Sequence, residues 1–301
     1  MPGEFIRQES QFREWVTNAP DSQFPAEANR YHLYVSYACP WAHRTLIYRT
    51  LKGLENAISV SVVHPLMLSE GWVFGEYTGA TADVVNGTQK LRQVYEIAEP
   101  AYEGRVTVPV LWDKHQRTIV NNESSEIIRM LNSAFDTWGR SNVDFYPPSL
   151  RTEIDSVNAF VYDKVNNGVY RCGFATTQSA YEQAFDNLFE ALDELEARLS
   201  QQAYLVGKRI TEADWRLFTT LVRFDAVYYS HFKCNRQRLI DYPNLWNYVR
   251  ELYQIPGIAQ TVNMDHIKYH YFGSHHSLNP TGIVPKGPNL DFGGAYWRGE
   301  F

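Results

Sequence analysis

Residues 31–51 read YHLYVSYACPWAHRTLIYRTL and place a single cysteine between a predicted strand and a predicted helix. The first five residues are aromatic or β-branched, which is typical of a buried strand. Pro40 suits the first turn of a helix, because its missing N–H would have no intrahelical partner there. Apolar residues then follow at near-helical spacing up to Leu51. The stretch therefore predicts a strand, a short turn and a helix that begins at or just after Cys39.

A cysteine at a helix N-terminus is a candidate nucleophile. The free N–H groups and the helix dipole favour a thiolate, and such surroundings lower a thiol pKa from about 8.5 to roughly 3.5–7.5. We expect His43 and Arg44, one turn further on, to add positive potential. The alternative is a small buried core cysteine. Ala42 stands where a C-x-x-C motif has its second cysteine, so a disulfide at Cys39 must be resolved by an external thiol, of which glutathione is the most abundant in cells.

Composition narrows the class of protein. The chain has 301 residues, enough for two domains, and 44% of them are hydrophobic. Its net charge of −6 predicts no binding to nucleic acid or to an anionic membrane, and leaves small molecules as the expected partners. The other two cysteines, Cys172 and Cys234, lie far apart in the sequence and are expected to be structural. With no long apolar run and no disulfide framework, we expect a cytoplasmic protein.

The remaining elements of the first half follow the order strand, long loop, helix, strand, strand and helix. We expect an arm at 1–30, a strand at 58–63, a long insertion at 65–105 that holds Trp72 and includes a helix at 89–102, strands at 105–112 and 118–120, and a helix that opens within 121–126. An insertion of about 40 residues exceeds the ~2–6 residues of a usual connection, and ordered loops of that length are commonly functional.

Two further features of this half bear on the site. Pro109 interrupts a strand pattern, which predicts an edge position or a special turn, and a cis Val108–Pro109 bond is one way to accommodate it. Residues 121–126 begin a second helix, with Asn122 or Ser124 near its N-cap. The N-terminus of that helix is suited to hold a carboxylate.

The second half is predicted to be all-helical. We expect a linker at 133–148, a helical domain at 149–270 and a tail at 271–301. Thr211 and Asp214 have the spacing of a capping box, with Ile210 and Trp215 as its hydrophobic staple, so Asp214 is interpreted as structural.

The order of elements in residues 31–132 resembles the thioredoxin-like domain of the glutathione transferases, in which a helical domain follows. The motifs that carry this resemblance are Cys39-Pro40-Trp41-Ala42, Val108-Pro109 and Asn122-Glu123-Ser124. The resemblance implies an α/β thioredoxin-like N-terminal domain and an all-α C-terminal domain. It also implies that the Val108 backbone binds the cysteinyl part of glutathione, and that Glu123 and Ser124 bind its γ-glutamyl end.

The Tyr-rich segment at 160–175 and the His-rich segment at 265–280 extend the resemblance. With residues 30–35, 105–112 and 221–225, they resemble the glutathionyl-hydroquinone reductases, also called Xi-class glutathione transferases. The resemblance implies reductive removal of glutathione from glutathionyl-hydroquinones, with glutathione as co-substrate and a homodimer formed through the helical domains. The implied roles are Cys39 as nucleophile, Trp72, Arg105, Val108, Glu123 and Ser124 as glutathione ligands, and Tyr162 and Tyr271 as residues facing the aromatic substrate.

Chemistry favours the same roles. Attack of a thiolate on the glutathione sulfur must expel an aryl carbon, which requires a protonated ring, and the Tyr162 hydroxyl could donate that proton. A second glutathione then resolves the Cys39 mixed disulfide. Two alternatives remain, namely an omega-like thiol transferase or dehydroascorbate reductase, and a non-catalytic binder of aromatic ligands. The four histidines at 266, 270, 275 and 276 fit no tight zinc spacing, so we expect no metal.

Overall fold

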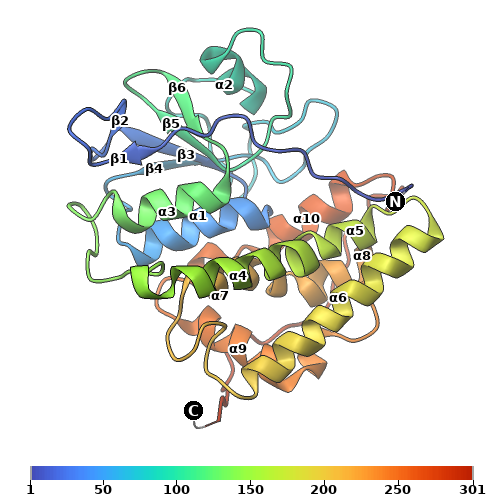
Figure 1. The fold of residues 1–301 in the computed structure, drawn as a ribbon. Helices are drawn as coiled ribbons and strands as arrows, with labels where there is room; N and C mark the ends of the chain where they lie inside the picture. The colour runs from blue at the N-terminus through green and yellow to red at the C-terminus, as the bar shows by residue number, and fades with distance from the viewer. Residues whose placement is uncertain (1, 300–301) are drawn as a thin grey trace. The chain divides into compact units, whose positions relative to one another are not determined.

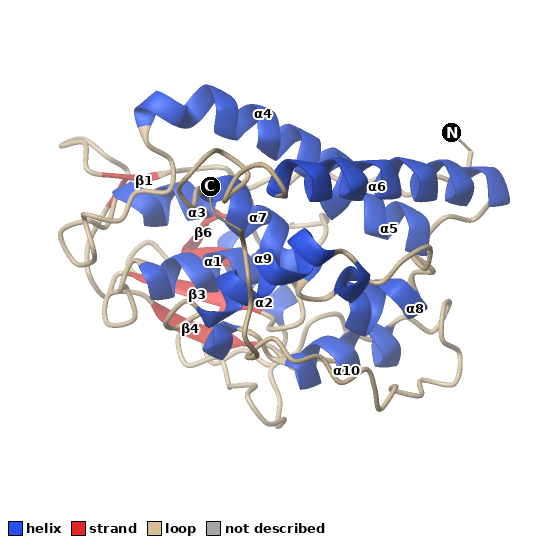
Figure 2. Cartoon of the chain, turned by 90° about the horizontal axis from the view of Figure 1, so that it is seen from below, coloured by secondary structure: helices blue, strands red, loops and turns tan. Residues whose placement is uncertain are grey.

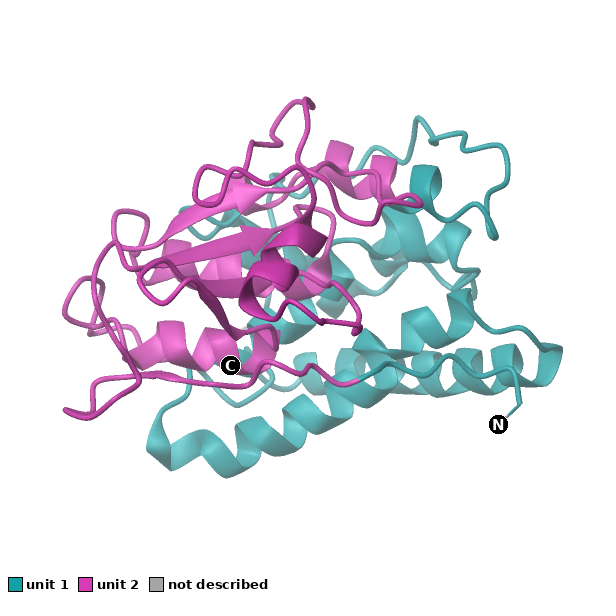
Figure 3. Cartoon of the chain, turned by 90° about the horizontal axis from the view of Figure 1, so that it is seen from above, with its two compact units in different colours: residues 1–8, 145–259, 271–301 teal, residues 9–144, 260–270 magenta. Residues whose placement is uncertain are grey.

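The computed structural model describes residues 2–299. The chain forms two compact units, shown in teal and magenta in Figure 3. Unit 2 comprises residues 9–144 and 260–270, and unit 1 comprises residues 1–8, 145–259 and 271–301. The predicted domains placed 260–270 with the helices and all of 1–30 in one arm, whereas here 260–270 and 9–30 group with the sheet.

Unit 2 is a thioredoxin-like α/β unit with a four-stranded sheet in the order β4-β3-β5-β6 (Figures 1 and 2). Strands β3 and β4 are parallel, and β5 is antiparallel to both of its neighbours. Helices α1 and α3 pack together on one face, and α2 lies beside β6 on the other. The elements are β1 Val16–Thr17, β2 Phe24–Pro25, β3 Tyr31–Val35, α1 Pro40–Leu51, β4 Ser59–Val62, α2 Leu91–Ala98, β5 Val110–Asp113, β6 Thr118–Asn121 and α3 Ser124–Ser133.

The predicted order of elements is confirmed, but two elements are shorter than expected. The prediction of a strand over 105–112 was wrong in its first half, because β5 begins only at Val110. Before it, tyrosine hydroxyls rather than a neighbouring strand bond the backbone: Tyr95 donates to the Thr107 carbonyl and Tyr102 to the Arg105 carbonyl, each at 2.9 Å. Helix α2 ends at Ala98, since the residue before a proline disfavours helical geometry and Pro100 follows Glu99.

Both edges of the sheet are covered by irregular segments. At β6, the Glu14 N–H donates to the Val120 carbonyl at 3.0 Å, and the Asn122 N–H donates to the Phe12 carbonyl at 3.1 Å. At β4, the Thr81 N–H donates to the Val62 carbonyl, and the Val62 N–H donates to the Thr81 hydroxyl, each at 2.9 Å. The N-terminal segment is therefore bonded to β6, and the stretch around Thr81 is bonded to β4.

A single carboxylate, Asp83, organises the long insertion. Its two oxygens accept bonds from the N–H groups of residues 85, 86 and 88, from the Thr88 hydroxyl and from the Tyr34 hydroxyl of β3. Burial alone would raise the pKa of Asp83, but these hydrogen bonds outweigh it and the pKa lies below its ordinary value. The insertion is thus ordered although it contains little regular structure, and sequence patterns gave no sign of this hub.

Unit 1 is helical apart from its loops. Its helices are α4 Arg151–Val161, α5 Gly168–Gly173, α6 Gln178–Leu199, α7 Glu212–Leu221, α8 Tyr229–His231, α9 Pro243–Gln254 and the end of α10 Met264–Ser274, with π-helical turns η2 Tyr162–Asn166 and η3 Phe224–Tyr228. The predicted capping box is confirmed: Asp214 accepts from the Thr211 N–H at 2.8 Å and also from the Tyr248 hydroxyl at 2.8 Å. Within the described residues, no helix is long and apolar enough to cross a membrane.

The tail after α10 packs on α9. The Phe292 ring is buried and stacks on Tyr253 with ring centroids 5.2 Å apart. The Arg298 guanidinium pairs with the Glu251 carboxylate at 3.1 Å. This part of the tail thus belongs to the core of unit 1, although its sequence is rich in glycine and proline.

Buried His32 predicts a pH-dependent stability. It lies on β3 with no exposed surface, its Nδ1 2.7 Å from the Ser59 hydroxyl oxygen, and burial lowers its pKa from 6.5 to about 4. The unfolded chain therefore binds a proton near pH 6.5 that the folded chain does not bind until about pH 4. The free energy of unfolding should fall as pH drops through this window, by up to about 1.4 kcal/mol per pH unit for this histidine.

Urea unfolding between pH 7 and pH 4 tests this expectation. His32→Asn should flatten the pH dependence of the free energy of unfolding, whereas His115→Asn, at a residue whose side chain is 63% exposed, should leave it unchanged. An unaltered slope in His32→Asn contradicts the assignment.

Candidate functional site

Strand direction brings four segments of unit 2 to one edge of its sheet. Because β5 is antiparallel to both β3 and β6, the strands β3, β4 and β6 all run the same way. Their C-terminal ends and the start of β5 therefore meet at one end of the strands, which we call the C-terminal edge of the sheet. Cys39 follows β3, the segment leading to Trp72 follows β4, Val108 precedes β5, and Glu123 follows β6.

Cys39 is the N-cap residue of α1, and Pro40 is the first helical residue, so the predicted position of the cysteine is confirmed. Its backbone is extended, with φ −75° and ψ 121°, and its carbonyl accepts the His43 N–H at 3.0 Å. The side chain is partly exposed, and Sγ lies 3.5 Å from the Val108 carbonyl oxygen. The Val108–Pro109 bond is cis, which is one of the arrangements that the sequence left open for Pro109. The sulfur thus faces the proline-bearing segment and is not enclosed in the core.

The two basic residues of the first turn of α1 are buried. His43 Nε2 lies 2.7 Å from the Thr261 hydroxyl oxygen. The Arg44 guanidinium lies over the Trp41 ring at 4.5 Å, and one of its nitrogens is 3.4 Å from the Ser124 hydroxyl oxygen. Arg44 therefore joins the cysteine-bearing helix to the start of α3. The sequence indicated only that Arg44 would contribute charge near Cys39.

Glu123 is the N-cap of α3, a position that the sequence assigned to Asn122 or Ser124. Its carboxylate accepts from the Ser125 N–H at 3.0 Å, from the Ser125 hydroxyl at 2.9 Å and from the Ser10 hydroxyl at 3.2 Å. Burial alone would raise the pKa of Glu123, but these bonds and the nearby Arg44 charge lower it overall. The carboxylate is therefore held ionised at a helix N-terminus.

Ser10 was not anticipated as part of this site. It lies in the N-terminal segment, and its hydroxyl is 3.3 Å from the Asn122 carbonyl oxygen in addition to its contact with Glu123. No local pattern distinguishes it, because its role follows from the pairing of the segment with β6.

Trp72 and Arg105 occupy different surroundings. Trp72 is 6% exposed, and its ring stacks on His270 with centroids 4.9 Å apart and planes 21° apart. Arg105 has an exposed side chain on the segment that precedes Val108. The five residues expected to bind glutathione thus all belong to unit 2. Val108 contacts Cys39 directly, whereas Trp72 and Arg105 are placed by the loops that carry them.

The two tyrosines expected to face an aromatic substrate lie in unit 1. Tyr162 begins the π-helical turn η2 and is 36% exposed. Tyr271 is 1% exposed, and its hydroxyl oxygen lies 2.6 Å from that of Tyr170 and 3.0 Å from that of Tyr228. Burial raises the pKa of Tyr271 well above its ordinary value. Contact of either residue with substrate stays a prediction, and Tyr170 and Tyr228 join Tyr271 in a hydroxyl cluster that sequence reasoning missed.

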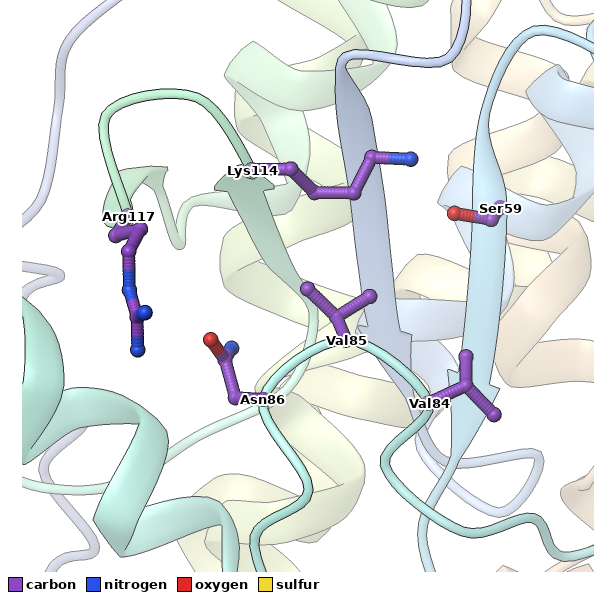
Figure 4. A pocket seen from close by; sticks show the side chains of 6 residues that line it. All are labelled: Ser59, Val84, Val85, Asn86, Lys114 and Arg117. Carbon is purple, nitrogen blue, oxygen red and sulfur yellow. The ribbon is translucent and has the colours of Figure 1, made fainter.

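A separate cavity of about 370 Å³ lies elsewhere in unit 2 (Figure 4). It is lined by Ser59, Val84, Val85, Asn86, Lys114 and Arg117. Residue Lys114 directly follows Asp113, which pairs with Tyr31 at the start of β3, whereas Cys39 follows the end of that strand. The cavity is therefore at the opposite edge of the sheet from the cysteine. Among residues 2–299, no group of three histidine, cysteine or acidic side chains could hold a metal ion.

Comparisons with known proteins identify both units. Residues 38–134 match the family described as "Glutathione S-transferase, N-terminal domain", and residues 178–251 match "Glutathione S-transferase, C-terminal domain". The glutathionyl-hydroquinone reductase PcpF of Sphingobium chlorophenolicum is 57% identical over 286 residues, covering 95% of this chain and 90% of that protein.

A second relative has a solved structure. The glutathionyl-hydroquinone reductase YqjG of Escherichia coli is 57% identical over 303 residues, covering 98% of this chain and 92% of that protein. Its glutathione-bound structure has a TM-score of 0.93 and covers 96% of each chain. A Xi-class glutathione transferase from Natrialba magadii is 53% identical with a TM-score of 0.94, covering 95% of this chain and 88% of that one. The chain therefore belongs to the glutathione transferases and, among them, to the Xi-class glutathionyl-hydroquinone reductases.

Proposed function

We propose that the protein reduces glutathionyl-hydroquinones to hydroquinones with glutathione as the reductant. The observation that carries this proposal is the position of Cys39: a partly exposed thiol at the N-cap of α1, 3.5 Å from the Val108 carbonyl oxygen and at the same sheet edge as the N-terminus of α3. A helix N-terminus stabilises a thiolate, which is the reactive form. Within the family that includes YqjG and PcpF, this arrangement suits attack on a glutathione sulfur.

Glutathione would bind along this edge of unit 2. The Val108 backbone, just before the cis proline, would pair with the cysteinyl part of the tripeptide and so align its sulfur with Cys39. The Glu123 carboxylate would accept from the γ-glutamyl ammonium, and Ser124 at the first turn of α3 would bind the γ-glutamyl carboxylate. Trp72 and Arg105 would contact the remaining part of the tripeptide.

The reaction balances without any further reductant. The substrate ring is first protonated at the carbon that bears sulfur, which gives the keto tautomer, and the Tyr162 hydroxyl would donate or relay this proton. The Cys39 thiolate attacks the glutathione sulfur, the aryl carbon–sulfur bond breaks, and its electron pair leaves with the ring, which becomes hydroquinone. A second glutathione thiolate attacks the Cys39–glutathione disulfide, giving glutathione disulfide and regenerating Cys39.

The setting of this activity is also part of the proposal. Cys39, Cys172 and Cys234 form no disulfide with one another, which is consistent with a reducing compartment such as the cytoplasm, where glutathione is kept reduced. We propose that the chain works there as a homodimer formed through its helical unit.

Replacement of Cys39 should abolish the chemistry. With glutathionyl-menadione as substrate, Cys39→Ser should form glutathione disulfide at least about a thousandfold more slowly than the wild type, because the nucleophile is lost. After exposure to glutathione disulfide, the intact mass of the wild type should show one glutathione adduct, absent in Cys39→Ser. The buried Cys172 offers a control, and Cys172→Ser should retain both the turnover and the adduct. Undiminished turnover in Cys39→Ser contradicts the proposal.

The proposed proton donor separates this reaction from simple thiol transfer. Tyr162→Phe should lower kcat for glutathionyl-menadione by roughly a hundredfold, because a positioned general acid contributes about that much. Turnover of a small mixed disulfide should change less than twofold, since a thiolate leaving group needs no ring proton. Equal losses on both substrates would show that Tyr162 does not act as the acid, and a wild type active only on mixed disulfides would favour an omega-like thiol transferase.

The Glu123 carboxylate should set glutathione affinity. Glu123→Gln keeps a side-chain oxygen for the N-cap but removes the charge, and we expect the KM for glutathione to rise roughly tenfold. Because the pKa of Glu123 lies below its ordinary value, wild-type glutathione binding should persist as pH is lowered to about 4.5 and weaken only below it.

Glu126→Gln is the matched control for this prediction. Glu126 lies in the same helical turn but pairs with Arg13 and Asn121, so its replacement should leave the KM unchanged. Equal effects of the two substitutions, measured by steady-state kinetics and by calorimetry with glutathione, would refute the role of Glu123.

A further inference from the structure

The His-rich segment has a role that its composition did not indicate. Its first part, within Gln260–His270, belongs to unit 2, although more than a hundred residues of unit 1 precede it in the chain. There it packs against residues 64–78, the beginning of the long insertion that carries Trp72. We call residues 263–270 the clamp segment.

Three residues of the clamp segment contact the end of this loop at Tyr77 and Thr78. The Tyr77 hydroxyl donates to the Asp265 carboxylate at 2.6 Å, and the Tyr77 ring stacks on Tyr269 with centroids 5.1 Å apart. His266 Nε2 lies 2.7 Å from the Thr78 carbonyl oxygen, so this nitrogen carries the hydrogen. The loop is thus bonded to the clamp segment through its backbone and its side chains.

His270, the last residue of the clamp segment, contacts Trp72. Its Nδ1 lies 2.8 Å from the Pro65 carbonyl oxygen, so Nδ1 carries the hydrogen. Its ring stacks on Trp72, with centroids 4.9 Å and planes 21° apart. Both side chains are buried, at 7% and 6% exposure. His270 therefore connects Pro65, shortly after β4, with Trp72. Its stacked ring also fixes the plane in which the Trp72 indole lies.

We infer that His270 is a positioning residue for glutathione binding, acting through Trp72. The inference rests on the proposed function, in which Trp72 contacts glutathione. A loop residue that must be ordered on binding costs affinity, and a loop already held in place does not. The bond to Pro65 and the stack on Trp72 together provide that order. Of the four histidines in the His-rich segment, His266 and His270 thus act as hydrogen-bond donors to the loop backbone.

Two substitutions separate the two contacts of His270. His270→Phe keeps an aromatic ring against Trp72 but loses the bond to Pro65, whereas His270→Gln can still donate to Pro65 but loses the stack. Each should raise the KM and the Kd for glutathione roughly three- to tenfold, as loss of one aromatic or hydrogen-bonded contact implies. The kcat at saturating glutathione should stay within twofold. His276→Gln, at an exposed histidine of the same motif, should change none of these values.

A double-mutant cycle tests whether His270 acts through Trp72. In a Trp72→Leu background, His270→Gln should cause no further loss of glutathione affinity, because the partner of the stack is already gone. An equal further loss in that background, or wild-type affinity in both His270 variants, overturns the inference. Thermal unfolding identifies any variant that fails to fold. If His270→Phe fails to fold, His270→Gln, which retains the Pro65 contact, still tests the inference.

Failure of the inference and failure of the proposed function give different results. A wild type that binds glutathione but forms no glutathione disulfide from glutathionyl-menadione contradicts the proposed function, and calorimetry on the His270 variants still decides the inference. A wild type that turns over normally while the His270 variants match it in KM contradicts the inference alone.

Discussion

The antiparallel placement of β5 is the constraint on which the rest of the site depends. Because β5 separates β3 from β6 and runs opposite to both, the two helices that follow β3 and β6 must begin at the same edge of the sheet. One of these N-termini carries the Cys39 sulfur and the other the Glu123 carboxylate. The dipole of α1 can therefore stabilise a thiolate, and the dipole of α3 can stabilise a bound carboxylate. The backbone that precedes β5 lies between the two helix N-termini. The strand order thus brings the two helix N-termini together, whichever side chains they carry.

Arg44 shows how the two helices are linked. It lies on α1, one turn after the cysteine, and reaches the Ser124 hydroxyl at the start of α3. It is buried, and the stack on Trp41 keeps its planar guanidinium in one orientation. A buried cation is costly unless its surroundings compensate the charge, and the nearby ionised Glu123 contributes to that compensation. Replacing Arg44 would therefore disturb the Glu123 carboxylate as well as the helix that begins at Cys39.

Local signals predicted the parts of the fold that depend on local chemistry. The strand, the Cys-Pro step and the apolar helix around Cys39 all appear at their predicted places, because N-terminal proline and strand composition act within a few residues. The capping box at Thr211 and Asp214 is another such case. The strand pattern at 105–109 led to a wrong prediction. Alternating residues cannot reveal that the hydroxyls of Tyr95 and Tyr102, and not a neighbouring strand, donate hydrogen bonds to the backbone carbonyls there. The proposed glutathione ligands came from the family resemblance, because periodicity alone could not assign them.

Contacts between segments distant in the sequence could not be predicted in this way. Ser10, Asp83 and His270 each act on a segment tens to hundreds of residues away, and none has a local pattern that marks it.

The covered outer strands β4 and β6 also result from contacts between distant segments, and they limit how chains can associate. With Glu14 and Phe12 bonded along β6 and Thr81 along β4, neither outer strand offers a free row of backbone donors and acceptors at these positions. Addition of a strand from another molecule is blocked at these positions, which protects this part of the sheet from the edge-to-edge pairing that leads to aggregation.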